Sequence, residues 1–135
     1  MSNDILNILI IEDNKDLVDI MCEMLVLSGY RALSAKNGTE GIAKARENRP
    51  DVIICDIGLP DMSGYEVAKI IRKDSELKDT YLIASSGYAQ PEDVERSRET
   101  GFNIHLAKPI SFNILGKVLK GVKLKCMQWT DNIIF

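Results

Sequence analysis

The sequence has few cysteines and a single histidine, which excludes several kinds of redox and metal site. The three cysteines stand far apart, at positions 22, 55 and 126, and form no CxxC pair. An odd, scattered set argues against a disulfide framework and is typical of a reducing compartment. His105 is the only histidine, so a zinc site with the familiar cysteine–histidine spacings is excluded. We therefore expect a cytoplasmic protein without such a site.

The chain also lacks long apolar runs, a strong net charge and internal repeats. Its apolar runs are far shorter than the roughly 20 residues that a membrane-spanning helix needs, and positions 1–4 do not begin a signal peptide. The net charge of −3 favours neither nucleic acid nor a membrane surface as a direct partner. With 135 residues, 45% of them hydrophobic, the sequence fits one globular domain.

Short β-type runs alternate with helical periods along the chain. The aliphatic run 8–11 is typical of a strand buried on both faces, and Asn14 after it can cap a helix that stops at Gly29. The predicted strands are 8–11, 30–35, 52–55, 81–84 and 104–107. The predicted helices begin near Asn14, Thr39, Ser63, Pro91 and Ile114. This alternation predicts an α/β protein with a parallel five-stranded sheet covered by helices on both faces.

The fourth predicted helix and the C-terminal segment are the weakest parts of this pattern. Val94 is the only strongly apolar anchor in a helix of mostly charged residues, so we expect this helix to be the least firmly packed. Positions 123–135 follow the last apolar positions of the fifth helix and are too few to form a core of their own. We therefore assign 1–122 to the domain and 123–135 to a C-terminal tail.

The residues with chemical potential follow the predicted strands at their carboxyl ends. Glu12 and Asp13 end the first strand, Asp56 the third, Ser86 the fourth and Lys108 the fifth. These ends share one edge of a parallel sheet, where ligands bind near the point of reversed strand order. Three carboxylates repel one another there, and a hard divalent cation such as Mg²⁺ relieves the repulsion.

A cation, an ammonium and a hydroxyl together form a site for a transferred phosphoryl group. Asp56 is the best candidate for the nucleophile that becomes an aspartyl phosphate, and Gly58 after it lets a backbone carbonyl approach the metal. Each feature has a simpler explanation alone: Glu12 and Asp13 as a charge pair at a helix start, Lys108 as a solvated lysine. Their matching positions at strand ends favour the site.

Four stretches of the sequence resemble the receiver domain of response regulators in two-component signalling. They are ILIIEDN (8–14), PDVIICDIGLPDMSGYEV (50–67), LIASSGYAQPED (82–93) and GFNIHLAKP (101–109). Found together in this order and at these separations, the four stretches are highly specific for that family. The residues of these stretches are similar to those of chemotaxis receivers, and most similar to those of receivers associated with hybrid sensor kinases. The resemblance implies a flavodoxin-like three-layer (βα)5 sandwich with strand order 2-1-3-4-5.

The resemblance also implies a role for each residue of the site. Asp56 accepts the phosphoryl group from a histidine kinase or a histidine phosphotransfer protein, Lys108 pairs with the phosphoryl oxygens, and the Ser86 hydroxyl turns toward them. The implied Mg²⁺ ligands are the Asp13 and Asp56 side chains, the Gly58 carbonyl oxygen and, through water, Glu12. Such a protein is a signalling switch and not an enzyme, since it catalyses only its own phosphorylation and dephosphorylation.

Four positions near the site are implied to tune it or to transmit its state. Gly87 is the small residue after Ser86, Tyr88 can shield the acyl phosphate, and Pro109 follows a cis peptide, although from sequence alone either isomer is open. The family usually has Tyr or Phe where His105 stands. We therefore expect coupling from Ser86 to the face of the fourth helix, fifth strand and fifth helix to be weaker or to use the imidazole differently.

The implied function is a phosphorylation switch that binds an output protein through this face. We expect a monomer or a weak phosphorylation-dependent dimer. One alternative is a receiver-like binding module independent of phosphorylation, against which the intact acids and Lys108 argue. The other is an aspartyl-phosphate phosphatase of the haloacid-dehalogenase type. That family has a second Asp two residues after the nucleophile, where this chain has Gly58.

Overall fold

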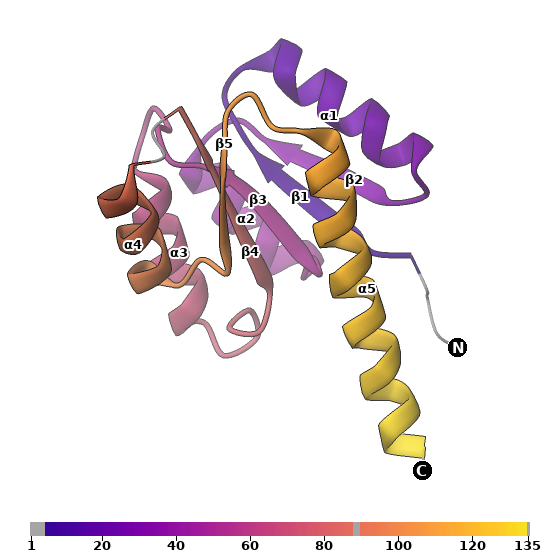
Figure 1. The fold of residues 1–135 in the computed structure, drawn as a ribbon. Helices are drawn as coiled ribbons and strands as arrows, with labels where there is room; N and C mark the ends of the chain where they lie inside the picture. Colours follow the sequence, from indigo (N-terminus) through magenta and orange to yellow (C-terminus); the bar gives the residue numbers. More distant parts are fainter. Residues whose placement is uncertain (1–4, 88–89, 135) are drawn as a thin grey trace.

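Five parallel strands form one sheet with helices on both faces in the computed structural model (Figure 1). The structure describes residues 5–87 and 90–134, and for residues 126–134 it gives only the course of the backbone. The strands are β1 (Asn7–Ile11), β2 (Arg31–Ala35), β3 (Val52–Asp56), β4 (Tyr81–Ser86) and β5 (Ile104–Ala107). They lie in the order β2-β1-β3-β4-β5, and each pairing is parallel. Both the fold class and the implied strand order are confirmed.

The helices follow the strands in strict alternation, and the first and third begin at the side-chain caps that the sequence predicts. They are α1 (Lys15–Leu27), α2 (Gly38–Asn48), α3 (Gly64–Lys73), α4 (Pro91–Thr100) and α5 (Phe112–Ile134). The Asn14 side chain accepts a hydrogen bond from the Leu17 N–H at 3.1 Å, and the Ser63 hydroxyl accepts one from the Glu66 N–H at 3.3 Å. Helix α5 runs on past the predicted apolar positions to Ile134. Within the described residues, we find no helix of the length and apolarity that crossing a membrane requires.

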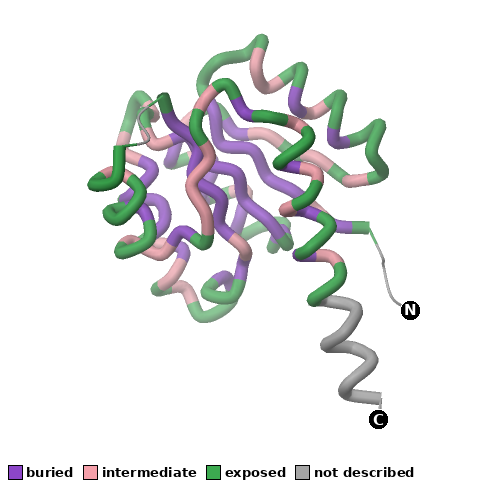
Figure 2. Tube along the Cα trace, viewed as in Figure 1, coloured by how far each residue is buried: buried purple, intermediate pink, exposed green. Residues whose placement is uncertain are grey.

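Two apolar layers hold the helices against the sheet, whose central strands are buried on both faces (Figure 2). Helices α1 and α5 cover one face, and α2 and α3 cover the other, with α4 beside α3 (Figure 1). Met21 of α1 and Leu115 of α5 belong to the first layer, and Val67 and Ile71 of α3 to the second. Burial of these side chains fixes the sheet and thereby the positions of the residues at its edge.

The buried side chain of helix α4 is not the one that the sequence predicts. The prediction that Val94 anchors the helix was wrong, because Val94 is 41% exposed. The single buried position in this fully described helix is Ser97, at 2%. Helix α4 also contacts α3 through Arg96, whose guanidinium lies 4.3 Å from the centroid of the Tyr65 ring. Both of these contacts are made by polar side chains of α4.

The loop after β3 is fixed to α2 by the carboxylate of Asp61. This carboxylate accepts hydrogen bonds from the N–H groups of Gly38 (2.8 Å) and Thr39 (2.9 Å), and from the Thr39 hydroxyl (2.7 Å). The Thr39 hydroxyl and these N–H groups lower the pKa of Asp61 to about 2. A negative charge at a helix N-terminus is favourable, so Asp61 ties the loop that follows Asp56 to α2.

Asp61→Asn is expected to lower the melting temperature at pH 7 and to have little effect near pH 2. A carboxylate whose pKa is lowered by folding stabilises the protein fully above its ordinary value of 3.8. That contribution is lost as the pH falls through about 2. Circular dichroism melts from pH 7 to pH 2 measure the difference between variant and wild type. The exposed Asp79→Asn is the control, and a difference that stays constant with pH contradicts the expected role.

Candidate functional site

The acids predicted at the ends of β1 and β3 meet at the carboxyl edge of the sheet. The pairing of Ile11 with Cys55 brings Glu12 next to Asp56. Glu12 is 5% and Asp56 7% exposed, whereas Asp13 is exposed. One side-chain oxygen from each of the three lies within 4.8 Å of the others. Strand order reverses between β1 and β3, so the acids lie where open α/β sheets bind ligands.

Lys108, directly after β5, brings an ammonium to these acids. Its Nζ lies 2.9 Å from Glu12 Oε1 and 3.3 Å from Asp56 Oδ1. Burial lowers the pKa of Lys108, but the hydrogen bond to Glu12 and the charges of Asp56 and Glu12 outweigh it, and the pKa is raised. Lys108 therefore keeps its proton and carries a positive charge at the site. The peptide between it and Pro109 is cis, the isomer that the resemblance implies.

The site brings three carboxylates together with the ammonium of Lys108, and one of the three, Glu12, is buried. The pKa of Glu12 is raised, chiefly by burial, although hydrogen bonds to Lys108 and to the Asn14 N–H (3.1 Å) act to lower it. The charge of Asp56 adds to the rise. Clustered carboxylate oxygens with unfavourable charge form the donor set that Mg²⁺ prefers. The residues present therefore fit the metal that the sequence analysis predicts.

Gly58 lies in the exposed loop after Asp56, and its N–H donates to Asp56 Oδ1 at 3.3 Å. A Cβ added at Gly58 would meet no atom within 4 Å among the described residues. Packing within that part of the chain therefore gives no reason for a glycine. The expectation that its carbonyl oxygen faces a metal stays a prediction.

Ser86 reaches the site from β4, but its hydroxyl faces the imidazole of His105. Asp56 pairs with Ser85, so Ser86 is one residue further along that strand edge. Its Oγ lies 3.0 Å from His105 Nε2, and His105 Nδ1 lies 3.1 Å from Ser97 Oγ. The His105 side chain is partly buried. Gly87 is exposed, and Tyr88 lies outside the described residues.

Ser97 is the contact that sequence reasoning missed. It is the buried position of a helix whose other residues are mostly charged, and no local sequence pattern marks it. Its hydroxyl connects α4 to the ring of His105 on β5. The contact links the site edge of the sheet to α4.

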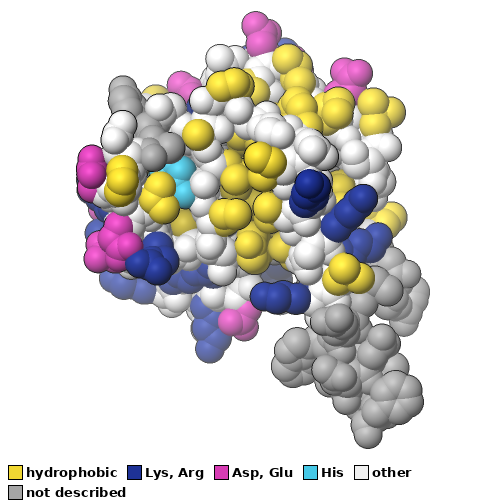
Figure 3. Space-filling model, viewed as in Figure 1, with side chains coloured by type: hydrophobic (Ala, Val, Ile, Leu, Met, Phe, Trp, Pro, Cys, Tyr) yellow, Lys and Arg dark blue, Asp and Glu magenta, His cyan; other side chains and the backbone are white. Residues whose placement is uncertain are grey.

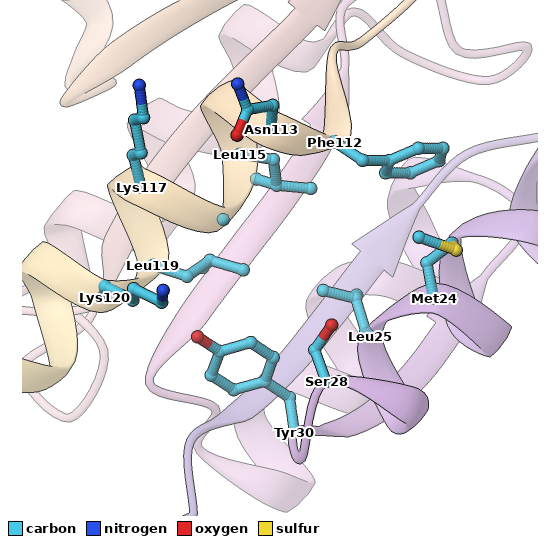
Figure 4. Close-up of a pocket in the computed structure, with 11 residues that line it drawn as sticks. Met24, Leu25, Ser28, Tyr30, Phe112, Asn113, Leu115, Lys117, Leu119 and Lys120 are labelled. Carbon is cyan, nitrogen blue, oxygen red and sulfur yellow. The ribbon is translucent and has the colours of Figure 1, made fainter.

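A cavity of about 310 Å³ between α1 and α5 is separate from the acidic site (Figure 4). Leu25 of α1 faces Leu119 of α5 across it, Met24 points toward Phe112, and Tyr30 lies at one end. Tyr30 precedes β2, so this end lies toward the amino edge of the sheet, opposite the acids. The charged residues in its lining are Lys117 and Lys120. No carboxylate is among the described residues that line it, so it lacks both the phosphoryl acceptor and the metal ligands of the acidic site.

Comparisons with known proteins agree with the fold and identify the family. The family model described as response regulator receiver domain matches residues 8–120. The polar-differentiation response regulator DivK of Brucella anthropi is 39% identical over 105 residues, which cover 78% of this chain and 85% of that protein.

Among solved structures, chemotaxis response regulator CheY4 of Vibrio cholerae is similar with a TM-score of 0.82 and 30% identity. The match covers 87% of this chain and 98% of that one. The signal receiver domain of a signal transduction histidine kinase from Syntrophus aciditrophicus has a TM-score of 0.81 and 28% identity, covering 89% and 91% of the two chains. Matches of this extent establish the family.

Proposed function

Because this chain belongs to the family of response-regulator receiver domains, which act as signalling switches, we propose that it accepts a phosphoryl group on Asp56. The observation that carries the proposal is the placement of the Asp56 carboxylate. It is buried at the carboxyl edge of the sheet, 3.3 Å from the Lys108 ammonium and clustered with Glu12 and Asp13. A histidine kinase or a histidine phosphotransfer protein is the proposed donor.

The transfer uses one oxygen of Asp56 as the nucleophile. That oxygen attacks the phosphorus of the donor's phosphohistidine, the P–N bond breaks, and its electron pair stays on the leaving imidazole, which takes up a proton. The Lys108 ammonium offsets the charge on the transferred oxygens. Mg²⁺ held by Asp13, Asp56 and the Gly58 carbonyl, with Glu12 acting through water, supplies further positive charge when bound.

The product is a switch state, read on the face of α4, β5 and α5. Apolar side chains gather over this part of the molecule beside the single histidine (Figure 3). Ile114 at the start of α5 is 50% exposed and Val94 on α4 is 41% exposed. Exposed apolar groups of this kind suit a protein partner, so we assign the output partner to this face. A phosphatase is disfavoured, because Gly58 offers no second acid for turnover.

Mg²⁺ is expected to stabilise the wild type against unfolding and to have little effect on Asp13→Asn. A ligand at 100 times its Kd contributes about 2.7 kcal/mol if it binds only the folded state. Asp13 is exposed, so the substitution removes one metal ligand with little disturbance of the core. Thermal melts with a Mg²⁺ titration and EDTA reversal measure the effect. Asp79→Asn is the control, and equal stabilisation of Asp13→Asn and wild type contradicts the proposed ligand set.

A further inference from the structure

We propose that His105 is a positioning residue that ties the Ser86 hydroxyl to helix α4 through the buried Ser97 hydroxyl. The imidazole on β5 stands between the two: Nε2 lies 3.0 Å from Ser86 Oγ, and Nδ1 lies 3.1 Å from Ser97 Oγ. The inference rests on the proposed function, since the position of Ser86 matters only if Asp56 carries a phosphoryl group.

The contacts of Ser97 give the hydrogen-bond chain a direction. Its hydroxyl has one hydrogen and lies 2.9 Å from the Val94 carbonyl oxygen, which can only accept. With that hydrogen donated to Val94, Ser97 Oγ accepts from His105 Nδ1–H. A neutral imidazole carries one N–H, so Nε2 is then an acceptor, and the Ser86 hydroxyl donates to it.

Phosphorylation competes with His105 for the hydrogen of Ser86. Phosphoryl oxygens only accept hydrogen bonds, and the Ser86 hydroxyl has one hydrogen to give. It can donate to Nε2 or to a phosphoryl oxygen on Asp56, but not to both. A phosphoryl group that captures Ser86 therefore removes one of the bonds that hold the ring, and the ring in turn holds Ser97.

Helix α4 is the element on which such a small change can act. Val94 is 41% exposed, Ser97 is the single buried position of the helix, and Arg96 adds a contact to the Tyr65 ring. An element with few buried apolar contacts shifts at low free-energy cost. The chain from Ser86 through His105 to Ser97 thus connects the state of Asp56 to the position of α4.

The imidazole can be observed directly, because His105 is the only histidine. Long-range ¹H–¹⁵N correlation spectra are expected to show the Nδ1–H tautomer in the free protein. Saturation with Mg²⁺ and beryllofluoride, which mimics the phosphoryl group, is expected to shift the Nε2 signal downfield as its hydrogen bond is lost. An Nε2–H tautomer in the free protein, or an unmoved ring with the analogue bound, overturns the inference and leaves the proposed function intact. Failure of the analogue to bind at all overturns both.

Ser97→Ala tests the coupling from the α4 end. Without its acceptor at Ser97, the ring can take the Nε2–H form and donate to Ser86, which frees the Ser86 hydrogen. We expect beryllofluoride to bind between about twofold and tenfold more tightly, the range for one hydrogen bond, with smaller amide shifts in α4.

Thr100→Ala is the matched control on the same helix. The Thr100 hydroxyl donates to the Ser97 carbonyl oxygen at 2.9 Å, not to the side chain that holds the ring. We expect it to bind beryllofluoride as the wild type does. Equal affinities of Ser97→Ala and Thr100→Ala would contradict the coupling. The wild-type spectra test the hydrogen-bond chain independently if Ser97→Ala folds poorly.

Discussion

Asp56→Asn is expected to abolish labelling of the protein by acetyl phosphate and Mg²⁺, leaving only background. The amide is a poor nucleophile and has no charge with which to hold the metal. The fold should persist, because the side chain keeps its size and Lys108 keeps its 2.9 Å bond to Glu12. Removing one of three clustered carboxylates also relieves repulsion. Intact-mass spectrometry measures the labelled fraction over time, and circular dichroism melts check the fold.

Asp79→Asn is the matched control for this substitution. Asp79 is exposed and precedes β4, at the opposite edge of the sheet from the acidic site. It loses the same charge in the same chemical change. The variant should label at the wild-type rate. Labelling of Asp56→Asn at that rate would show that another residue is the acceptor.

Lys108→Ala is expected to slow labelling about 100-fold and at the same time to tighten Mg²⁺ binding. The slower rate follows from loss of a positive charge placed near the transferred oxygens, where one preorganised group commonly contributes a factor of about 10² to 10³. The tighter metal binding follows because the ammonium competes with Mg²⁺ for Glu12 and Asp56. Its Nζ lies 2.9 Å from Glu12 Oε1 and 3.3 Å from Asp56 Oδ1. A purely structural role for Lys108 would weaken both.

Labelling rates and a Mg²⁺ titration followed by thermal melts separate the two effects. Lys73→Ala, at an exposed position in the last turn of α3, is the control and should change neither. Weaker Mg²⁺ binding by Lys108→Ala would contradict the competition that the distances imply. An unchanged labelling rate would contradict contact between Lys108 and the phosphoryl group.

The acidic site was predictable because parallel strands deliver their carboxyl ends to one edge. Short β-type runs before Glu12, Asp56 and Lys108 mark the strands, and the alternation with helices predicts a parallel sheet. The alternation does not determine which strand joins which edge. The order 2-1-3-4-5 therefore came from the family resemblance and not from the residue pattern.

The contacts of α4 and of the loop after β3 were not predictable from local pattern. A ten-residue helix with one strongly apolar residue has no periodicity to fix its inward face. The sequence therefore predicts Val94 as the anchor, whereas the buried side chain is Ser97. The bond of Asp61 to Thr39 spans 22 residues, and nothing local in either segment indicates it. Such contacts depend on how the helices pack on the sheet, which the spacing of residues within one segment does not specify.

The most direct test of phosphoryl transfer is to locate the phosphoryl group in the wild-type protein. Borohydride reduces an aspartyl phosphate to homoserine, which peptide mass spectrometry can place in the sequence. After incubation with acetyl phosphate and Mg²⁺, homoserine is expected at position 56, and it should be absent when EDTA replaces the metal. Homoserine at Asp13 or elsewhere, or none under conditions where Mg²⁺ binds, would contradict the role assigned to Asp56.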